Sequence, residues 1–343
     1  MILAADIGGT KTHVALFDWK DERVDPERER TYFSRDYAAF EEILAEFLAA
    51  PPPPSDSGEA EAQPLPPIDV LCAGIAGPVV GNRCQTTNLP WIVDGAELAK
   101  RFGIPTVKLL NDLEANAYGL LVLRPDEVEV LNAGSPPKEP AAKALIAAGT
   151  GLGEAILFPH RTHYHPMPSE GGHADFAPNT DAEIELLRYL RTNYLHVSWE
   201  RLLSGAGLHA IYEFLRDTKK NEPTWVAERL KVEDPAAVIG EIGLNRGAEI
   251  CVQALDMFTA IYGAEAGNLA LKALSLSGLY VGGGIAPRLL PKLKEGGFVR
   301  AFMNKGRYKR LMSGIPLKVI VNPKAALIGA ASAGSRVVQG AMR

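Results

Sequence analysis

Hydrophobic and polar positions form blocks at the start of the chain, where two apolar runs flank a pair of glycines. Residues 2–18 read ILAADIGGTKTHVALFD, with aliphatic residues on both sides of GGT. Apolar runs of this length bounded by glycine are typical of β-strands. The pattern therefore predicts two strands joined by a glycine turn, with the carboxylate of Asp6 at the end of the first strand.

The same order of strand, glycine turn and strand returns about half a chain later. Residues 143–158 read KALIAAGTGLGEAILF, and a third glycine run, in GLYVGGGIAPRLLPKL at 278–293, is predicted to join a strand to a helix. Periodic apolar positions predict further helices. The first predicted helix is at 37–49, and the second follows the strand predicted at 106–112. Further helices are predicted through much of 181–275. The last is predicted at the end of the chain, after the strand that opens VIVNPKAALIGAASAGSRVV.

One segment between predicted elements differs in composition from the rest. Residues 51–67 read PPPPSDSGEAEAQPLPP, rich in proline, serine and acidic residues. Such a segment cannot pack a core and is expected to be an exposed, mobile loop. Since an apolar run, IDVLCAGIAG, follows at once, the loop interrupts a domain and does not separate two domains.

Composition adds limits on partners and compartment. The 343 residues allow two domains, and the net charge of −5 argues against a nucleic-acid-binding surface. The basic run KGRYKR at 305–310 is explained by a solvated turn. The three cysteines, Cys72, Cys84 and Cys251, show neither a disulfide framework nor zinc spacing. With no apolar stretch of membrane-spanning length and no signal-peptide pattern, a cytoplasmic protein without membrane association is expected.

The glycine runs could be plain hairpin turns or phosphate cradles, because glycine lets backbone N–H groups approach an anion. None matches the P-loop or the dinucleotide-binding pattern. Two similar hairpins indicate two similar domains facing one nucleotide, with the third run near the nucleoside or its phosphates. Asp6 is placed to hold Mg²⁺ directly or through water. The expected nucleotide-binding residues are Asp6, Gly8, Gly9, Thr10, Lys11, Gly149, Thr150, Gly151, Gly153, Gly282, Gly283 and Gly284.

Several motifs resemble those of known families. ADIGGTK, AAGTGLG, VGGGIAPR and ALIGAASAG resemble the phosphate, adenosine and connecting motifs of the sugar-kinase/actin/heat-shock ATPase superfamily. LLNDLEANAYG, SEGGHADFAPN and HVSWERLLSGAGL are more specific and are similar to the bacterial glucokinase family. The resemblance runs from residue 2 to the final helix. The insert 51–67 has no counterpart in it, and Lys11 stands where some relatives have Asn.

The resemblance implies an α/β fold of the two-domain actin-like/ribonuclease-H-like sugar kinase type with an interdomain cleft. The implied small domain is 1–122 plus 322–343, and the large domain is 123–321. The implied enzyme uses ATP and Mg²⁺ to phosphorylate the 6-hydroxyl of glucose and forms a homodimer. In this family the residues matching Asn111, Glu170, His173 and Glu200 bind glucose hydroxyls, and the residue matching Asp112 is the base. Carboxylates and amides suit this recognition, because each buried hydroxyl needs a partner.

Each of these polar residues also has a purely structural interpretation. Asn111 and Asp112 could cap a helix after a strand. His173 could be a core histidine, and Glu200 could be a surface helix charge. The run HRTHYH at 160–165 could bind a metal, but an exposed loop is favoured.

Two other functions stay open. The first is a ROK-type hexokinase of broad specificity, or one that uses polyphosphate. Enzymes of that kind usually carry a zinc-binding cysteine cluster after the EGGH-type motif. This chain has no cysteine between Cys84 and Cys251, which disfavours that function. The second is a non-catalytic sugar-sensing regulator, for which the sequence leaves no helix-turn-helix before the first glycine loop. The phosphoryl donor, the strictness for glucose and the oligomeric state stay open.

Overall fold

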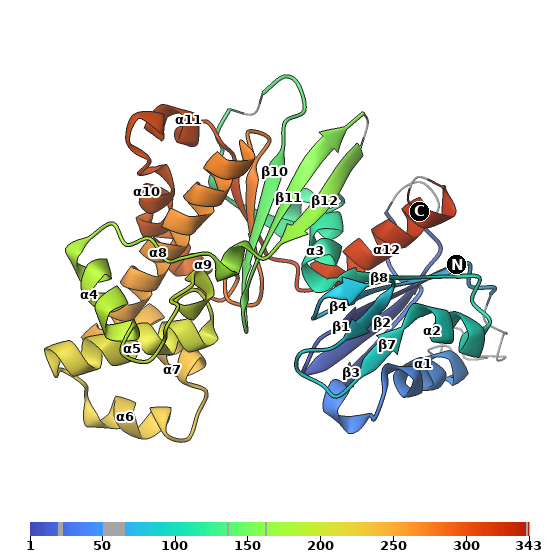
Figure 1. Cartoon of the computed structure of the whole chain (residues 1–343), viewed down its shortest axis with the longest axis horizontal. Helices are drawn as coiled ribbons and strands as arrows, with labels where there is room; N and C mark the ends of the chain where they lie inside the picture. Colours follow the sequence, from blue (N-terminus) through green and yellow to red (C-terminus); the bar gives the residue numbers. More distant parts are fainter. Residues whose placement is uncertain (20–22, 51–65, 136, 162, 341, 343) are drawn as a thin grey trace. The chain divides into compact units, whose positions relative to one another are not determined.

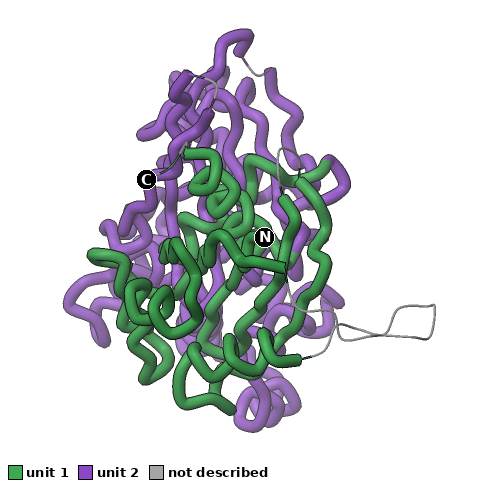
Figure 2. The backbone as a smooth tube through the Cα atoms, turned by 90° about the vertical axis from the view of Figure 1, so that its right-hand side faces the viewer, with its two compact units in different colours: residues 1–124, 323–343 green, residues 125–322 purple. Residues whose placement is uncertain are grey.

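The computed structural model describes residues 1–19, 23–50, 66–135, 137–161, 163–340 and 342. The chain forms two compact units, one of residues 1–124 with 323–343 and the other of residues 125–322 (Figure 2). We call them unit 1 and unit 2. Apart from its last two residues, the segment 51–67 that was expected to be a mobile loop lies outside the described residues.

Unit 1 is built on a five-stranded mixed sheet (Figure 1). Its first two strands pair antiparallel around the glycine turn, which confirms the hairpin predicted for residues 2–18. The first strand also pairs in parallel with the fourth, and the fourth with the eighth. The sheet order is β3 (Arg28–Phe33), β2 (Lys11–Phe17), β1 (Ile2–Ile7), β4 (Val70–Ile75) and β8 (Thr106–Asn111).

Helices cover both faces of this sheet because β1 is apolar on both sides. Leu3, Ala5 and Ile7 pack with α1 (Phe40–Ala49) and α2 (Gly95–Phe102). Ile2 and Ala4 point the other way and pack with α3 (Asp112–Leu120) and α12 (Ala325–Val338). A small second sheet precedes α2 and consists of β5 (Val79–Val80), β6 (Arg83–Gln85) and β7 (Ile92–Asp94).

Two glycines let α3 and α12 approach closely. A Cβ atom on Gly119 of α3 would overlap the carbonyl of Ala325, and one on Gly329 of α12 would overlap the carbonyl of Ala115. Gly329 belongs to the small-residue helix predicted at the end of the chain, which is confirmed. The close crossing fixes α3, and α3 begins at Asp112.

Unit 2 contains a six-stranded mixed sheet. Its hairpin of β10 and β11 is the second one that the sequence predicted. The strand predicted before GGG is β13, and it pairs in parallel with β10 on one side and with β14 on the other. The order is β12 (His163–Ser169), β11 (Leu152–His160), β10 (Lys143–Ala148), β13 (Leu279–Gly282), β14 (Leu317–Ile320) and β9 (Val128–Asn132).

The helices predicted between 181 and 275 are confirmed in unit 2. The longest, α8 (Glu249–Ala273), lies against the sheet, where the Tyr262 hydroxyl oxygen accepts from the N–H of Ala148 at 3.1 Å. The other helices of this stretch are α4 (Asp181–Leu190), α5 (Gly205–Lys219), α6 (Thr224–Leu230) and α7 (Pro235–Leu244). Short helices follow at α9 (Leu290–Lys294), α10 (Gly297–Met303) and α11 (Lys309–Ser313).

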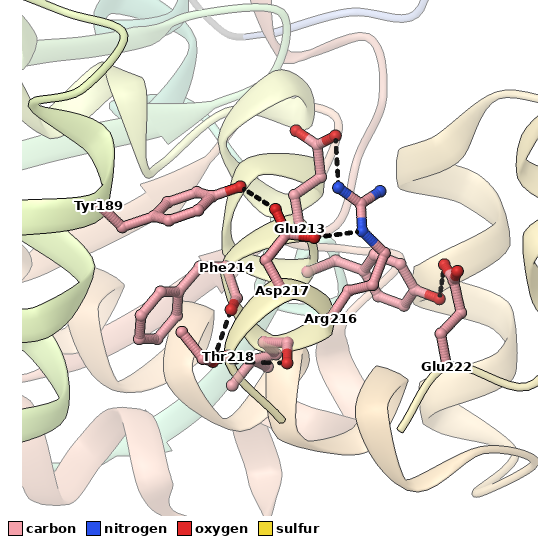
Figure 3. Close-up of polar contacts among 9 residues, drawn as sticks. Tyr189, Glu213, Phe214, Arg216, Asp217, Thr218 and Glu222 are labelled. Atoms are coloured by element: carbon pink, nitrogen blue, oxygen red, sulfur yellow. Dashed lines mark hydrogen bonds and ion pairs between the residues drawn. The ribbon is translucent and has the colours of Figure 1, made fainter. Parts of the chain in front are cut away.

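A polar network holds α5 to its neighbours, as Figure 3 shows. Asp217 accepts from the Tyr189 hydroxyl of α4 and from Arg216 Nε, both at 2.7 Å. The Tyr212 hydroxyl donates to Glu222, beyond the end of α5, at 2.9 Å. The network orients α5, which begins at Gly205 directly after Ser204. Glu200 lies just before this point in the chain, so the position of α5 also bears on the position of Glu200.

Two local expectations differ from the structure. The helix after GGG begins at Leu290, so the glycine run leads first into turns and not directly into a helix. His160 and His163–His165 of HRTHYH lie on the strands β11 and β12, so the expected loop is instead a hairpin. Within the described ranges, no helix has the length and apolar character needed to cross a membrane.

Candidate functional site

The first glycine turn, residues 8–11, is anchored from β2 and from the end of β3. The Gly8 N–H donates to the Lys11 carbonyl at 3.0 Å. Ser34, which is fully buried, donates from its hydroxyl to the Gly8 carbonyl at 2.7 Å, and its N–H donates to the Thr10 carbonyl at 3.0 Å. These bonds hold the turn in one conformation while Thr10 and Lys11 stay exposed. A fixed turn with exposed backbone is what a phosphate cradle requires.

Asp6 and Asp112 bring two carboxyl groups to the same end of the unit 1 sheet. Asp6 lies near the carboxyl end of β1, and Asp112 directly follows β8. Burial, followed by the negative charge of Asp112, raises the pKa of Asp6 to about 7. A half-buried carboxyl group next to a second carboxylate is relieved by a bound cation. The oxygen donors of this pair fit Mg²⁺.

Asn111 is the residue that caps α3. Its Oδ1 accepts from the Leu113 N–H at 2.9 Å, and its Nδ2 donates to the Gly77 carbonyl at 3.1 Å. Asp112 is the first residue inside the helix, and its Oδ1 also accepts from Leu113 N–H at 2.9 Å. The capping interpretation is therefore right for Asn111. Gly77 has φ +146°, a conformation that favours glycine and sets the carbonyl that Asn111 contacts.

The second and third glycine runs meet in unit 2. The Gly149 N–H donates to the Gly151 carbonyl at 2.8 Å, and the Gly149 carbonyl accepts from Gly205, the first residue of α5, at 3.0 Å. Gly283 has φ +81°, and a Cβ there would overlap the backbone of Ala148. A Cβ on Gly284 would meet no atom within 4 Å. The remaining glycines of these runs are Gly153, opposite Ala147 in β10, and Gly282, which ends β13.

A pocket of about 360 Å³ opens beside the third glycine run. Ala236, Gly240 and Leu244 form one side, and they recur every four residues along α7. Ile285 and Leu289 lie opposite on the chain that follows Gly284, and the remaining lining residues are Leu208, Asp234, Ala237, Glu241 and Arg288. Sequence reasoning did not assign this pocket. The signal for it was the spacing of four residues between Ala236, Gly240 and Leu244, which places them on one face of a helix.

Glu200 is tied to the second hairpin. It is half-buried, and its Oε2 accepts from the Leu152 N–H at 3.0 Å. Its carbonyl accepts from the hydroxyl of Ser204, which caps α5 through the Gly207 N–H. A Cβ on Gly151 would lie 2.5 Å from Glu200 Oε2. Glu200 is thus held by the backbone next to Thr150 and is not a solvated helix charge.

Glu170 and His173 lie together at the short turn of residues 171–173. His173 Nε2 is 3.9 Å from Glu170 Oε2, and their side chains are 59% and 86% exposed. The core interpretation of His173 is therefore wrong. Two exposed polar groups at one turn are available to a ligand.

Each unit thus gathers its own share of the predicted residues. Asp6, the turn 8–11, Asn111 and Asp112 lie in unit 1. Residues 149–153, 282–284, Glu170, His173 and Glu200 lie in unit 2. The histidines of HRTHYH do not form a metal centre, since the described part of the chain contains no group of three or more side chains of His, Cys, Asp or Glu that could hold a metal.

Comparison with known proteins gives one consistent result. A family model described as Glucokinase matches residues 3–337. The curated glucokinase of Nostoc punctiforme is 40% identical and covers 98% of this chain and 99% of its own. The crystal structure of a glucokinase from an Antarctic psychrotroph has a TM-score of 0.80 at 30% identity, covering 97% of this chain and 98% of its own.

A more distant structure shares the fold. A ROK family glucokinase from Streptomyces griseus, in complex with glucose and AMPPNP, has a TM-score of 0.62 at 20% identity and covers 98% of this chain and 99% of its own. These likenesses confirm the predicted fold class, the α/β sugar kinase fold of the actin-like type.

Proposed function

The chain belongs to the glucokinase family, and we propose that the residues described above carry out ATP-dependent phosphorylation of the glucose 6-hydroxyl. The observation that supports these roles most directly is the pair of Asp6 and Asp112 beside the first glycine turn. One carboxyl group at this place is suited to a cation on the phosphates, and the other to the proton of the attacking hydroxyl.

Asp112 is the proposed general base. Its carboxylate accepts the proton of the 6-hydroxyl as that oxygen attacks the γ-phosphorus and the bond to ADP breaks. Phosphoryl transfer depends on positioning and electrostatics more than on base strength. The position of Asp112 follows from Asn111, which caps α3, and from the close packing of α3 on α12.

Asp6 is the proposed holder of Mg²⁺, directly or through water. When bound, the ion supplies positive charge that stabilises the transferring phosphoryl group. The proposed phosphate contacts are backbone N–H groups of the turns 8–11 and 149–151 other than those of Gly8 and Gly149, which bond within their own turns. Thr10, Lys11 and Thr150 are exposed there.

Glucose recognition is proposed for Asn111, Glu170, His173 and Glu200. The carboxylates and the amide accept hydrogen bonds from ring hydroxyls. Sugar analogues that lack these hydroxyls should therefore bind less well. The exposure of Glu170 and His173 and the backbone-fixed carboxylate of Glu200 support this assignment.

The unit 2 pocket favours a nucleoside triphosphate over polyphosphate as the phosphoryl donor. Its lining by Ala236, Gly240, Leu244, Ile285 and Leu289 suits a flat apolar base. Polyphosphate has no base to place there. Gly282, Gly283 and Gly284 lead directly into this pocket and are the proposed contacts on the nucleoside side.

We further propose a cytoplasmic homodimer with no nucleic-acid partner and no membrane association. The buried, unpaired thiols of Cys72, Cys84 and Cys251 agree with a reducing compartment. The net charge of −5 argues against a nucleic-acid-binding surface.

A coupled assay with the purified chain tests the proposal. It compares glucose, mannose, fructose and 2-deoxyglucose, each with ATP, ADP and polyphosphate, with and without Mg²⁺. The expected result is the highest kcat/KM for glucose with ATP and Mg²⁺. A preference for polyphosphate, or equal kcat/KM for all the sugars, would contradict the assignment.

A further inference from the structure

Two buried carboxyl groups interact in unit 2, and one of them contacts the turn that carries Glu170 and His173. Glu154 of β11 is 2% exposed and Glu265 of α8 is fully buried. The Oε1 atom of each has no hydrogen-bond partner among the residues that the structure describes. Buried polar atoms without a partner are costly, so this pair calls for a physical explanation.

Glu154 supports the turn through direct contacts. It lies opposite Ser169 in the pairing of β11 with β12, and the Ser169 hydroxyl donates to the Glu154 carbonyl at 3.2 Å. The Gly171 N–H donates to the same hydroxyl at 3.3 Å. A Cβ on Gly171 would overlap Glu154 Oε2 and lie 2.9 Å from its Cδ. The carboxyl group of Glu154 therefore fills the space directly under the residue that follows Glu170.

Glu265 of α8 provides the other half of the pair. It accepts from Asn268 Nδ2 at 2.7 Å, and its Oε1 lies 3.6 Å from Lys272 Nζ. Lys305 Nζ donates to Asn268 Oδ1 at 2.6 Å and so places a second positive charge nearby. Burial raises the pKa of Glu265, and these groups act against that rise.

The surroundings of the pair suit one negative charge and not two. The charged and titratable groups that face it are Tyr262 and Lys272 on α8 and Lys305 before α11. β10 places Ile146 beside Glu154. Burial, the charge of Glu265 and the hydrogen bond between the two carboxyl groups raise the pKa of Glu154 to about 8. A proton on Glu154 then supplies the donor that the two Oε1 atoms lack.

We propose that Glu154 is a positioning residue for glucose, whose protonated carboxyl group, bonded to Glu265, supports the turn that presents Glu170 and His173. When the pair loses this proton, two adjacent buried anions repel each other. Glu154 then moves against Gly171, the turn shifts, and glucose binds weakly. Asp112 lies in unit 1 and is not part of this contact network, so the effect falls on KM for glucose more than on kcat. The proposal rests on the proposed function.

Steady-state kinetics between about pH 6.5 and pH 9.5 test the role of Glu154. In the unmodified chain, KM for glucose at pH 9 should be about tenfold higher than at pH 7, because about a tenth of the molecules keep the proton. Glu154→Gln preserves the size and a donor to Glu265 but cannot ionise. Its KM for glucose should stay near the pH 7 value of the unmodified chain throughout. Glu185→Gln removes an exposed carboxylate of α4 and should follow the unmodified chain.

The outcomes separate the possibilities. An alkaline rise in KM that persists in Glu154→Gln, or its absence from the unmodified chain, overturns the positioning role. If Glu154→Gln does not fold, the unmodified chain decides: a rise confined to glucose supports the role, and an equal rise for ATP overturns it. Failure to phosphorylate glucose at any pH contradicts the proposed function instead.

Discussion

Glu200 accepts a hydrogen bond from the backbone N–H of Leu152 at 3.0 Å, which joins a proposed sugar-binding carboxylate to the hairpin proposed to hold phosphate. Both groups belong to unit 2. The strand β11 begins at Leu152. It therefore fixes the Glu200 carboxylate through its first N–H and also forms one strand of the hairpin proposed to hold phosphate.

Substitution of Gly151 tests this connection. In Gly151→Ala the new Cβ lies 2.5 Å from Glu200 Oε2, so the carboxylate must move and lose its bond to Leu152. Because a hydrogen bond to a charged group contributes about 1.5–3 kcal/mol, KM for glucose should rise about tenfold or more. Gly149→Ala is the control, since the nearest atom to its Cβ is Gly284 N at 3.9 Å. Equal KM values for glucose in the two variants would argue against the connection.

Asp112→Asn tests the base. Loss of a general base typically lowers kcat by about 10²–10⁴-fold. Because Asn111 supplies the cap of α3, the melting temperature should hardly change, and glucose affinity measured by calorimetry should change much less than kcat. Asn116→Ala, one turn along the same helix, serves as a control for local structure. A folded Asp112→Asn protein with nearly normal kcat would exclude Asp112 as the base.

Asp6→Asn should stabilise the metal-free chain at alkaline pH. The pKa of Asp6 is raised from 3.8 to about 7 in the folded chain. Above about pH 7 the group is ionised in both states, and the folded state bears the full cost of burying the charge. Below about pH 4 it is protonated in both states and the cost vanishes. The variant should therefore melt a few degrees higher than the unmodified chain at about pH 8, with no difference near pH 4.

The same Asp6 variant should lose most Mg²⁺-dependent activity. Differential scanning calorimetry at several pH values checks the melting temperatures, and a coupled assay with and without Mg²⁺ checks the activity. A gain in melting temperature that is the same at every pH would show that the raised pKa is not its source.

Adjacent glycines of the third run should behave differently. A Cβ on Gly283 would overlap the backbone of Ala148, and its φ of +81° strains other residues, so Gly283→Ala should lower the melting temperature. Gly284→Ala meets no atom within 4 Å and should fold normally. If Gly284 contacts the nucleoside, KM for ATP should rise in that variant while KM for glucose stays constant. An unchanged KM for ATP would remove Gly284 from the site.

Much of the site could be predicted because its signals are local. Glycine pairs between apolar runs predict hairpins, and Asp6 and Asp112 are recognisable as polar residues at strand ends. The start of α9 was not predicted, although Pro291 offers a physical reason. Proline fits the first turn of a helix, where α9 has it, but not the interior of a helix that started at Ile285.

The histidine hairpin was missed for a similar reason. Pro166 and Pro168 argue against a central strand, but β12 is the edge strand of its sheet, where proline is tolerated. The anchoring of the first turn by Ser34 and the pairing of Glu154 with Glu265 arise from residues far apart in the sequence. No local pattern predicts such contacts.

The discontinuous make-up of unit 1 has a consequence for synthesis on the ribosome. One face of its sheet, with Ile2, Ala4 and Phe17, is covered by α12 from the end of the chain. Residues 125–322 form a continuous unit and can fold as soon as they emerge. The apolar face of the first strands must stay exposed to solvent or to chaperones until residues 325–338 have left the exit tunnel. Unit 1, whose first strands are made before unit 2, therefore completes its core after unit 2.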